Sequence, residues 1–175
     1  MSEPADSGLQ SYPPPAYAPA VPPDLATAPP ARLATWAGAA AAAGVPVGVL
    51  WWLLAPGGAW FVDGADFMAW LPRDGVLALL GVVAGIATAA ILLPRRRKAG
   101  TAARAGAAVA GSLAGSVLAW RLGELAGGLA GKGSGDGAFV LRATGVLFLW
   151  PLAAAAVLFA GTVVSLLRSG PSREA

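Results

Sequence analysis

Four long hydrophobic stretches, separated by short polar segments, dominate the pattern along this 175-residue chain. Each stretch has about the 20 mainly apolar residues that a helix needs to cross the hydrocarbon core of a bilayer. The four windows cover approximately residues 33–55, 75–93, 105–126 and 145–167. The pattern predicts an all-α membrane protein with four transmembrane helices, in a membrane domain of residues 32–168.

The segments on either side of this domain have a different composition. Residues 1–31 hold nine of the fifteen prolines, together with Ser, Ala and Asp. Such a segment cannot bury a core, so we expect a disordered, Pro-rich cytoplasmic tail. Residues 169–175 are expected to form a short cytoplasmic C-terminal tail.

The basic residues predict how the chain is threaded. Eight Lys and Arg residues, including the run Arg95–Lys98, fall on one side of the four windows, and four fall on the other. The positive-inside rule then places both termini in the cytoplasm of a multi-pass protein of the cell (cytoplasmic) membrane. The basic run also fits a patch for nucleic acid or anionic lipid. A stop-transfer role accounts for it fully, and we expect no nucleic-acid partner.

Small residues recur at helical spacing inside the windows. Because lipid offers no hydrophobic drive for helices to associate, small residues that let two backbones approach carry the packing. The pairs with four-residue spacing are Gly44 and Gly48, Gly81 and Gly85, and Gly111 and Gly115. They predict packing between helices of one chain, with the contact face of a homo-oligomer as the alternative. Pro46 and Pro151 lie inside windows and predict kinks.

The chain also contains a candidate internal repeat. Residues 37–52 and 105–120 match at eight of sixteen positions without a gap, and the windows that follow both open with Gly-Val-Leu-x-Leu. A duplicated two-helix hairpin gives this pattern. Chance similarity between alanine-rich helices is the competing explanation.

The outer side carries most of the informative side chains. Six of the seven tryptophans, among them Trp150, fall at or beyond the outer ends of the windows. Residues 60–67 predict a short hairpin around the Asp63-Gly64 turn, with residues 139–142 as a third strand. An interfacial helix over residues 66–71 is the alternative to this small extracytoplasmic cap. Arg121 and Glu124 are spaced to form an interfacial ion pair.

A recognition surface on this cap is the strongest functional candidate. Its expected members are aromatic and charged residues of the outer side: Trp60, Asp63, Asp66, Trp70, Arg73, Arg121 and Glu124.

Composition excludes most catalytic chemistry. The chain is 57% hydrophobic, and only 12% of its residues are charged, against about 25% in an average soluble domain. It has no Cys and no His, so thiol nucleophiles, zinc–thiolate sites and imidazole bases are ruled out. We expect no catalytic residues, no metal and no cofactor.

Two functions therefore remain. The first is a non-enzymatic accessory or structural partner of an envelope-associated complex, with the lipid bilayer and a membrane or envelope protein as partners. The alternative is a small transporter or channel subunit, oligomerised through the glycine-rich helix faces. Transport is disfavoured because the windows offer few polar groups near the bilayer midplane.

Three segments, residues 73–81, 111–123 and 145–152, resemble a family of small actinobacterial membrane proteins that carry a domain of unknown function. The resemblance covers about residues 33–167. It implies four spans with an extracytoplasmic loop between the first two. It supplies no activity and no site residues.

Overall fold

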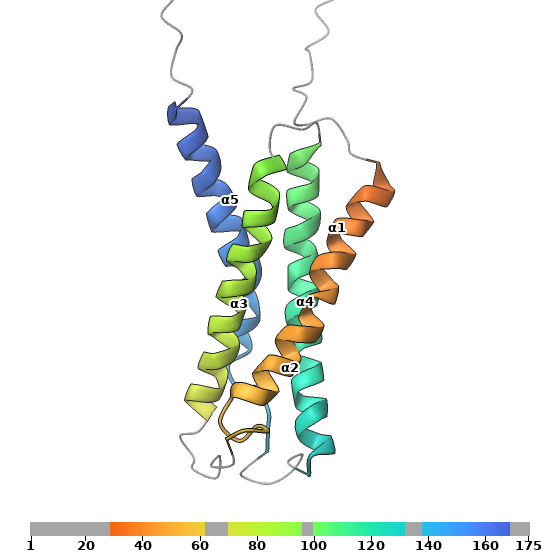
Figure 1. Ribbon diagram of the computed structural model, residues 1–175, viewed down its shortest axis with the longest axis vertical. Coiled ribbons are helices and arrows are strands. Elements are labelled where there is room, and N and C mark those ends of the chain that lie inside the picture. The colour runs from red at the N-terminus through yellow and green to blue at the C-terminus, as the bar shows by residue number, and fades with distance from the viewer. Residues whose placement is uncertain (1–28, 62–69, 96–99, 132–137, 169–175) are drawn as a thin grey trace, which may run out of the picture.

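The computed structural model describes residues 29–61, 70–95, 100–131 and 138–168 (Figure 1). Four helical segments in these ranges are long and apolar enough to cross a bilayer. They are Pro30–Leu54, Leu71–Arg95, Thr101–Leu129 and Thr144–Arg168. For the described residues, the prediction of an all-helical fold with four helices long and apolar enough to cross a membrane is confirmed. Most of the predicted N-terminal tail and all of the C-terminal tail lie outside the described residues.

The first span is divided into α1 (Pro30–Ala42) and α2 (Gly44–Leu54). Pro46 has no N–H to donate to the carbonyl of Ala42, so the helical ladder is interrupted there, and Ala43 separates the two helices. The first helix begins at Pro30, inside the segment predicted as tail, where a proline at the first helical position costs no hydrogen bond.

The other spans differ from the predicted windows mainly at their ends. The second consists of α3 (Trp70–Leu92) and a short 3₁₀ turn, η3 (Leu93–Arg95), and the third is α4 (Thr101–Leu129). The fourth opens with a 3₁₀ segment, η4 (Thr144–Phe148), and continues as α5 (Leu149–Arg168).

Pro151, which was predicted to kink a helix, lies close to the junction of η4 and α5. Pro151 lies in the first turn of α5, where backbone N–H groups have no intrahelical partner in any case. The missing N–H of Pro151 therefore breaks no helical bond.

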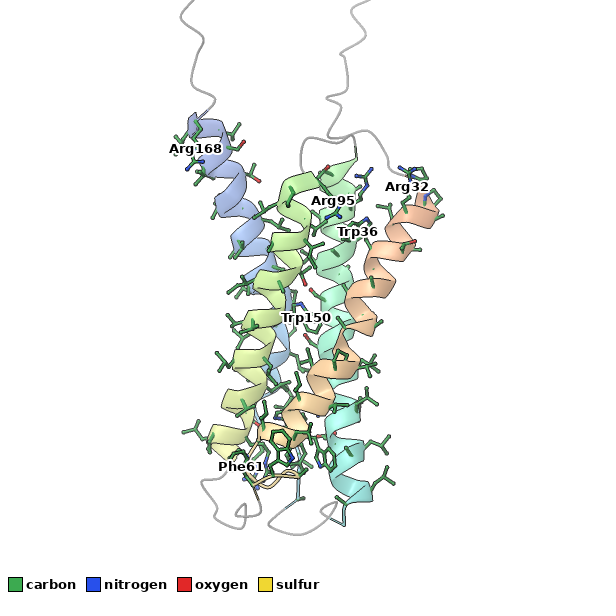
Figure 2. All side chains as sticks on the ribbon, in the orientation of Figure 1. Arg32, Trp36, Phe61, Arg95, Trp150 and Arg168 are labelled. Carbon is green, nitrogen blue, oxygen red and sulfur yellow. The ribbon has the colours of Figure 1, made fainter. Side chains whose placement is uncertain are left out.

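The bundle has two distinct ends (Figure 2). Arg32, Arg95 and Arg168 lie at one of them, called here the arginine end, and Phe61 lies at the opposite one, called the cap end. Along the bundle, α1 and α2 pack on α4, while α3 packs on α5. Contacts between α2 and α3 and between α4 and α5 join the two pairs. At the arginine end α1 and α5 diverge (Figure 1).

Glycine allows close approach between the first and third spans. A Cβ added to Gly44 would collide with the backbone of Gly115, and one added to Gly111 would collide with the backbone of Ala37. At Gly48 it would come within 2.5 Å of the carbonyl oxygen of Ala119. Larger side chains at these positions would force the helices apart.

The second and fourth spans meet around Trp150. The backbone carbonyl of Trp150 would lie 2.6 Å from a Cβ on Gly85, and Gly81 contacts the same residue. The Trp150 ring also faces Gly115 of α4. All six glycines predicted to pack helices thus contact other helices of their own chain: Gly44, Gly48, Gly81, Gly85, Gly111 and Gly115. Large apolar side chains such as Leu79 and Phe159 are exposed and cover the lipid-facing surface.

Trp150 itself is in the middle of the bundle rather than at the outer boundary predicted for it (Figure 2). It is 2% exposed, and its Nε1 donates to Oγ1 of Thr88 at 3.2 Å. Trp150 is buried this deeply because α5 begins only at Leu149, after a non-helical segment has already entered the bundle.

Candidate functional site

That non-helical segment, residues 138–143 and called here the strap, organises the cap end. It was predicted as a third strand, but the structure assigns these residues to neither strand nor helix. Phe139 and Leu141 are buried. A segment that is neither helix nor strand is tolerated at membrane depth only where other protein groups form hydrogen bonds with its backbone N–H and C=O groups. Ionisable side chains of α3 and α4 do so here.

Two carboxylates hold the strap by its amides. Oδ2 of Asp74 accepts hydrogen bonds from the backbone N–H groups of Arg142 at 3.1 Å and Ala143 at 2.7 Å. Oε1 of Glu124 accepts one from the N–H of Leu141 at 3.2 Å. Charged acceptors make stronger bonds than neutral ones, so α3 and α4 are fastened to the strap at consecutive residues.

Arg73 connects the strap to the rest of the cap. Its Nε donates to the carbonyl of Pro56 at 3.0 Å, and its Nη1 donates to the carbonyl of Ala138. The guanidinium carbon lies 5.0 Å from the centre of the Phe139 ring. At 3% exposure, Arg73 is inside the cap, so its predicted place on a recognition surface is wrong. The predicted hydrophobic window begins only at Gly75, whereas α3 extends back to Trp70 and includes Arg73 and Asp74, which bond to other segments through the Arg73 guanidinium and Oδ2 of Asp74. Oδ1 of Asp74 is buried without a hydrogen-bond partner among the described residues.

An aromatic pair fills the space beneath these bonds. The rings of Trp51 and Phe139 have centroids 4.7 Å apart at an angle of 49°. Nε1 of Trp51 donates to the backbone carbonyl of Arg73 at 2.9 Å. Each ring contacts a glycine of α4, Trp51 at Gly123 and Phe139 at Gly127. These contacts hold four chain segments together at the cap end: α2, α3, α4 and the strap.

Arg121 and Glu124 do not form the predicted pair. Arg121 is exposed and lies over the ring of Trp120, 4.1 Å from its centroid, whereas Glu124 turns toward Leu141. A cation over an aromatic face and a carboxylate bound to an amide are both favourable, so each group is satisfied without the other. Within the described residues no ion pair joins them.

The remaining candidate residues are less informative. Trp60 is 66% exposed at the end of the described part of the α2–α3 connection. Asp63 and Asp66 lie outside the described residues, as does the side chain of Trp70, which begins α3. The predicted hairpin over residues 60–67 lies largely in the same undescribed stretch.

Sequence reasoning missed three residues of the site. Asp74 was not singled out from the sequence, Phe139 was placed only at the start of a predicted third strand, and Trp51 was included only among the tryptophans of the outer side. The adjacent Arg73 and Asp74 at the head of a hydrophobic window were the available signal, because two charges there need partners once the helix extends past them. Their partners are far away in sequence and could not be named.

The cap end contains a surface groove of about 460 Å³ beside the strap. Its walls combine the charged groups of Arg121 and Glu124 with four apolar side chains, those of Leu125, Leu129, Phe139 and Val140. Leu125 is 58% exposed and Leu129 is 83% exposed. The groove can bind an apolar group flanked by charges. In the described residues no group of three or more Asp, Glu, His or Cys side chains is placed to hold a metal ion.

Comparison with protein families, with curated proteins and with solved structures finds no match for this chain. The resemblance to a family of actinobacterial membrane proteins therefore stays a prediction.

Proposed function

We propose that this protein is a non-enzymatic accessory component of the cell membrane, which binds a partner protein in the groove at its cap end. The observation that carries the proposal is the groove itself, an amphipathic surface on a rigidly fastened cap. The strap that forms one wall is held by Asp74, Glu124 and Arg73, so the groove is built before any partner arrives. A preformed surface binds with a smaller entropic cost than a flexible one.

The position of the groove along α4 favours a protein over lipid tails as its occupant. Arg121 is twenty residues after Thr101, which corresponds to about 30 Å of helix and so to about the thickness of the hydrocarbon core. Leu125 and Leu129 lie about 6 and 12 Å farther along the helix, in the headgroup region and beyond. Two exposed leucines there have no lipid tails to cover them.

The proposed orientation places the cap end outside the cell. It is supported by the concentration of Lys and Arg in the helix turns at the arginine end and in the segments that adjoin them in sequence, as the positive-inside rule requires for the cytoplasmic side. The groove would then face an extracytoplasmic part of the partner, in keeping with an envelope-associated complex.

Site-specific photo-crosslinking in cells tests this function. A crosslinking amino acid at Leu125 or Leu129 is expected to trap one discrete protein, whereas the same group at Leu113 or Phe159, exposed on lipid-facing surfaces, should trap none. Leu125→Glu should abolish copurification of the trapped protein, and Leu167→Glu, the same change at an exposed position near the end of α5, should not. Equal crosslinking from all four positions would contradict the proposal.

A second candidate is a transporter or channel subunit. It is favoured by one feature, a cavity of about 10 Å³ between the helices that is lined by Ser116 and Trp150 and has room for about one water. Against it, the Ser116 hydroxyl donates to the carbonyl of Ser112 in its own helix. Oligomerisation through the predicted glycine faces also loses its basis, because those glycines already contact helices of the same chain. Ion or solute flux into proteoliposomes, compared between wild type and Trp150→Ala, distinguishes this candidate.

We also infer that the bundle arose by duplication of a two-helix hairpin. The inference rests on the match between residues 37–52 and 105–120. In the bundle each span packs beside its counterpart, the first on the third and the second on the fourth.

A further inference from the structure

A second site lies at the opposite end of the molecule, between the diverging helices. A crevice of about 120 Å³ opens between α1 and α3, with α4 as its floor. Trp36, Ala39, Ala40 and Ala43 line it from the first span, Thr88 and Ile91 from α3, and Ala108 from α4. Its volume is close to the ~150 Å³ of an apolar protein cavity that holds one benzene molecule. It can therefore hold part of one hydrocarbon chain, and not a helix.

The lining of the crevice is almost entirely apolar. Six of the seven lining residues have apolar or aromatic side chains. The hydroxyl of Thr88 donates to the carbonyl of Ala84 at 2.8 Å and accepts from Nε1 of Trp150. Because the crevice lies along membrane-spanning helices, the ligand that reaches it most readily is a lipid chain.

Three arginines form a rim at the mouth of the crevice. On each of the three spans, one arginine lies four residues from a lining residue, on the side of the arginine end: Arg32 before Trp36 on α1, Arg104 before Ala108 on α4, and Arg95 of η3 after Ile91 of α3. Residues four apart share a helix face and differ by about 6 Å along the axis. The backbone positions of the three arginines are thus about one turn beyond the apolar lining, and the Arg95 side chain folds back toward it.

One of these arginines also joins the two walls. The guanidinium carbon of Arg95, in η3 at the end of the second span, lies 5.8 Å from the centre of the Trp36 ring on α1, and its Nη1 donates to the carbonyl of Ile91 (Figure 2). The Trp36 indole therefore lines the crevice and also contacts the guanidinium group of Arg95. An apolar slot beneath a ring of cations has the two parts needed to bind an amphiphile with a negative head.

We propose that this crevice is a binding site for an anionic phospholipid of the leaflet at the arginine end. One acyl chain occupies the slot, and the phosphate lies on Arg32, Arg95 and Arg104. The site does not depend on which end faces the cytoplasm, nor on the partner proposed for the groove. Basic pockets between transmembrane helices are a recurrent way of holding anionic headgroups.

Native mass spectrometry of the full chain released from nanodiscs provides the test. From an equal mixture of phosphatidylglycerol and phosphatidylcholine, one phosphatidylglycerol is expected to remain bound. Replacing a single rim arginine, as in Arg95→Gln, should weaken its retention about fivefold, which corresponds to the ~1 kcal/mol of one basic residue near an anionic headgroup. Arg121→Gln, which removes the same charge at the cap end, should leave retention unchanged. Equal retention of both lipids, or an equal effect of Arg121→Gln, would overturn the proposal.

The slot is tested separately from the charges. Ala39→Phe fills the crevice and should displace the lipid, whereas Ala34→Phe, at an exposed position on the opposite face of α1, should not. Both variants should unfold at temperatures close to that of the wild type. A competition experiment on the wild-type protein uses glycerophosphoglycerol, the headgroup without acyl chains. This compound should fail to displace the intact lipid. Competition by this headgroup, or full retention by a folded Ala39→Phe variant, would show attraction by surface charge alone and refute a seated chain.

Discussion

At the scale of single residues, the cap end shows how ionisable side chains near the end of a membrane helix can stabilise an irregular segment. Arg73 is buried and bonded to backbone carbonyls of two connections, at Pro56 and Ala138. Asp74, its neighbour, binds two amides of the strap. These groups replace the ladder that the strap lacks, so their first role is structural. Binding of a partner at the cap end therefore depends on these groups only because they hold the strap in place.

Replacing Arg73 should therefore destabilise the protein strongly. Arg73→Gln leaves buried carbonyls without donors, at a cost of about 1–3 kcal/mol each. Arg73→Lys keeps the charge but lacks the planar group that reaches both carbonyls, so it should rescue only part of the loss. Thermal unfolding in detergent measures both variants. Arg121→Gln is the control, because Arg121 is exposed and its removal should cost much less. Equal loss of stability in Arg73→Gln and Arg121→Gln would contradict the role assigned to Arg73.

At the scale of elements, the four spans could be predicted because each consists of about twenty consecutive, mainly apolar residues. The break after Ala42 could also be predicted, because Pro46 removes a backbone hydrogen bond within its own helix. The strap could not be predicted, because it is held by Asp74 and Glu124, which lie far from it in sequence. For the same reason the ends of α3 were missed: whether Arg73 and Asp74 belong to a helix depends on partners that appear only after folding.

The glycine contacts between elements give a prediction with an internal control. Gly111→Leu should separate α4 from α1, because Gly111 touches the backbone of Ala37. Overfilling a packed interface typically costs about 1–3 kcal/mol. Gly106→Leu, on the same helix but with no atom within 4 Å of an added Cβ, should be nearly neutral. The melting temperatures of the two variants in the same detergent make the comparison. Similar values would mean that α1 and α4 are not in contact in solution.

At the scale of the whole molecule, the two ends differ in composition and in construction. The arginine end is open, with diverging helices and a basic rim, whereas the cap end is closed by buried aromatic rings and charge-assisted bonds. This asymmetry suits a protein that meets lipid headgroups at one end and a protein partner at the other. The polarity of the bundle across the membrane therefore decides which compartment each site serves.

Thiol labelling can establish that polarity directly, because the chain contains no native cysteine to give a background signal. Ala59→Cys places an exposed thiol at the cap end, and Ala102→Cys places one at the arginine end, near the start of α4. A membrane-impermeant maleimide added to intact cells should label position 59 and leave position 102 unlabelled until the cells are opened. This result follows from the positive-inside rule, because the eight Lys and Arg residues assigned to one side belong to the helix turns at the arginine end or to the terminal and connecting segments that adjoin them in sequence. Labelling at 102 alone would reverse the orientation, and the groove would then have to find its partner in the cytoplasm. Labelling at both positions in intact cells would mean a population of mixed orientation, which the charge difference between the two ends argues against.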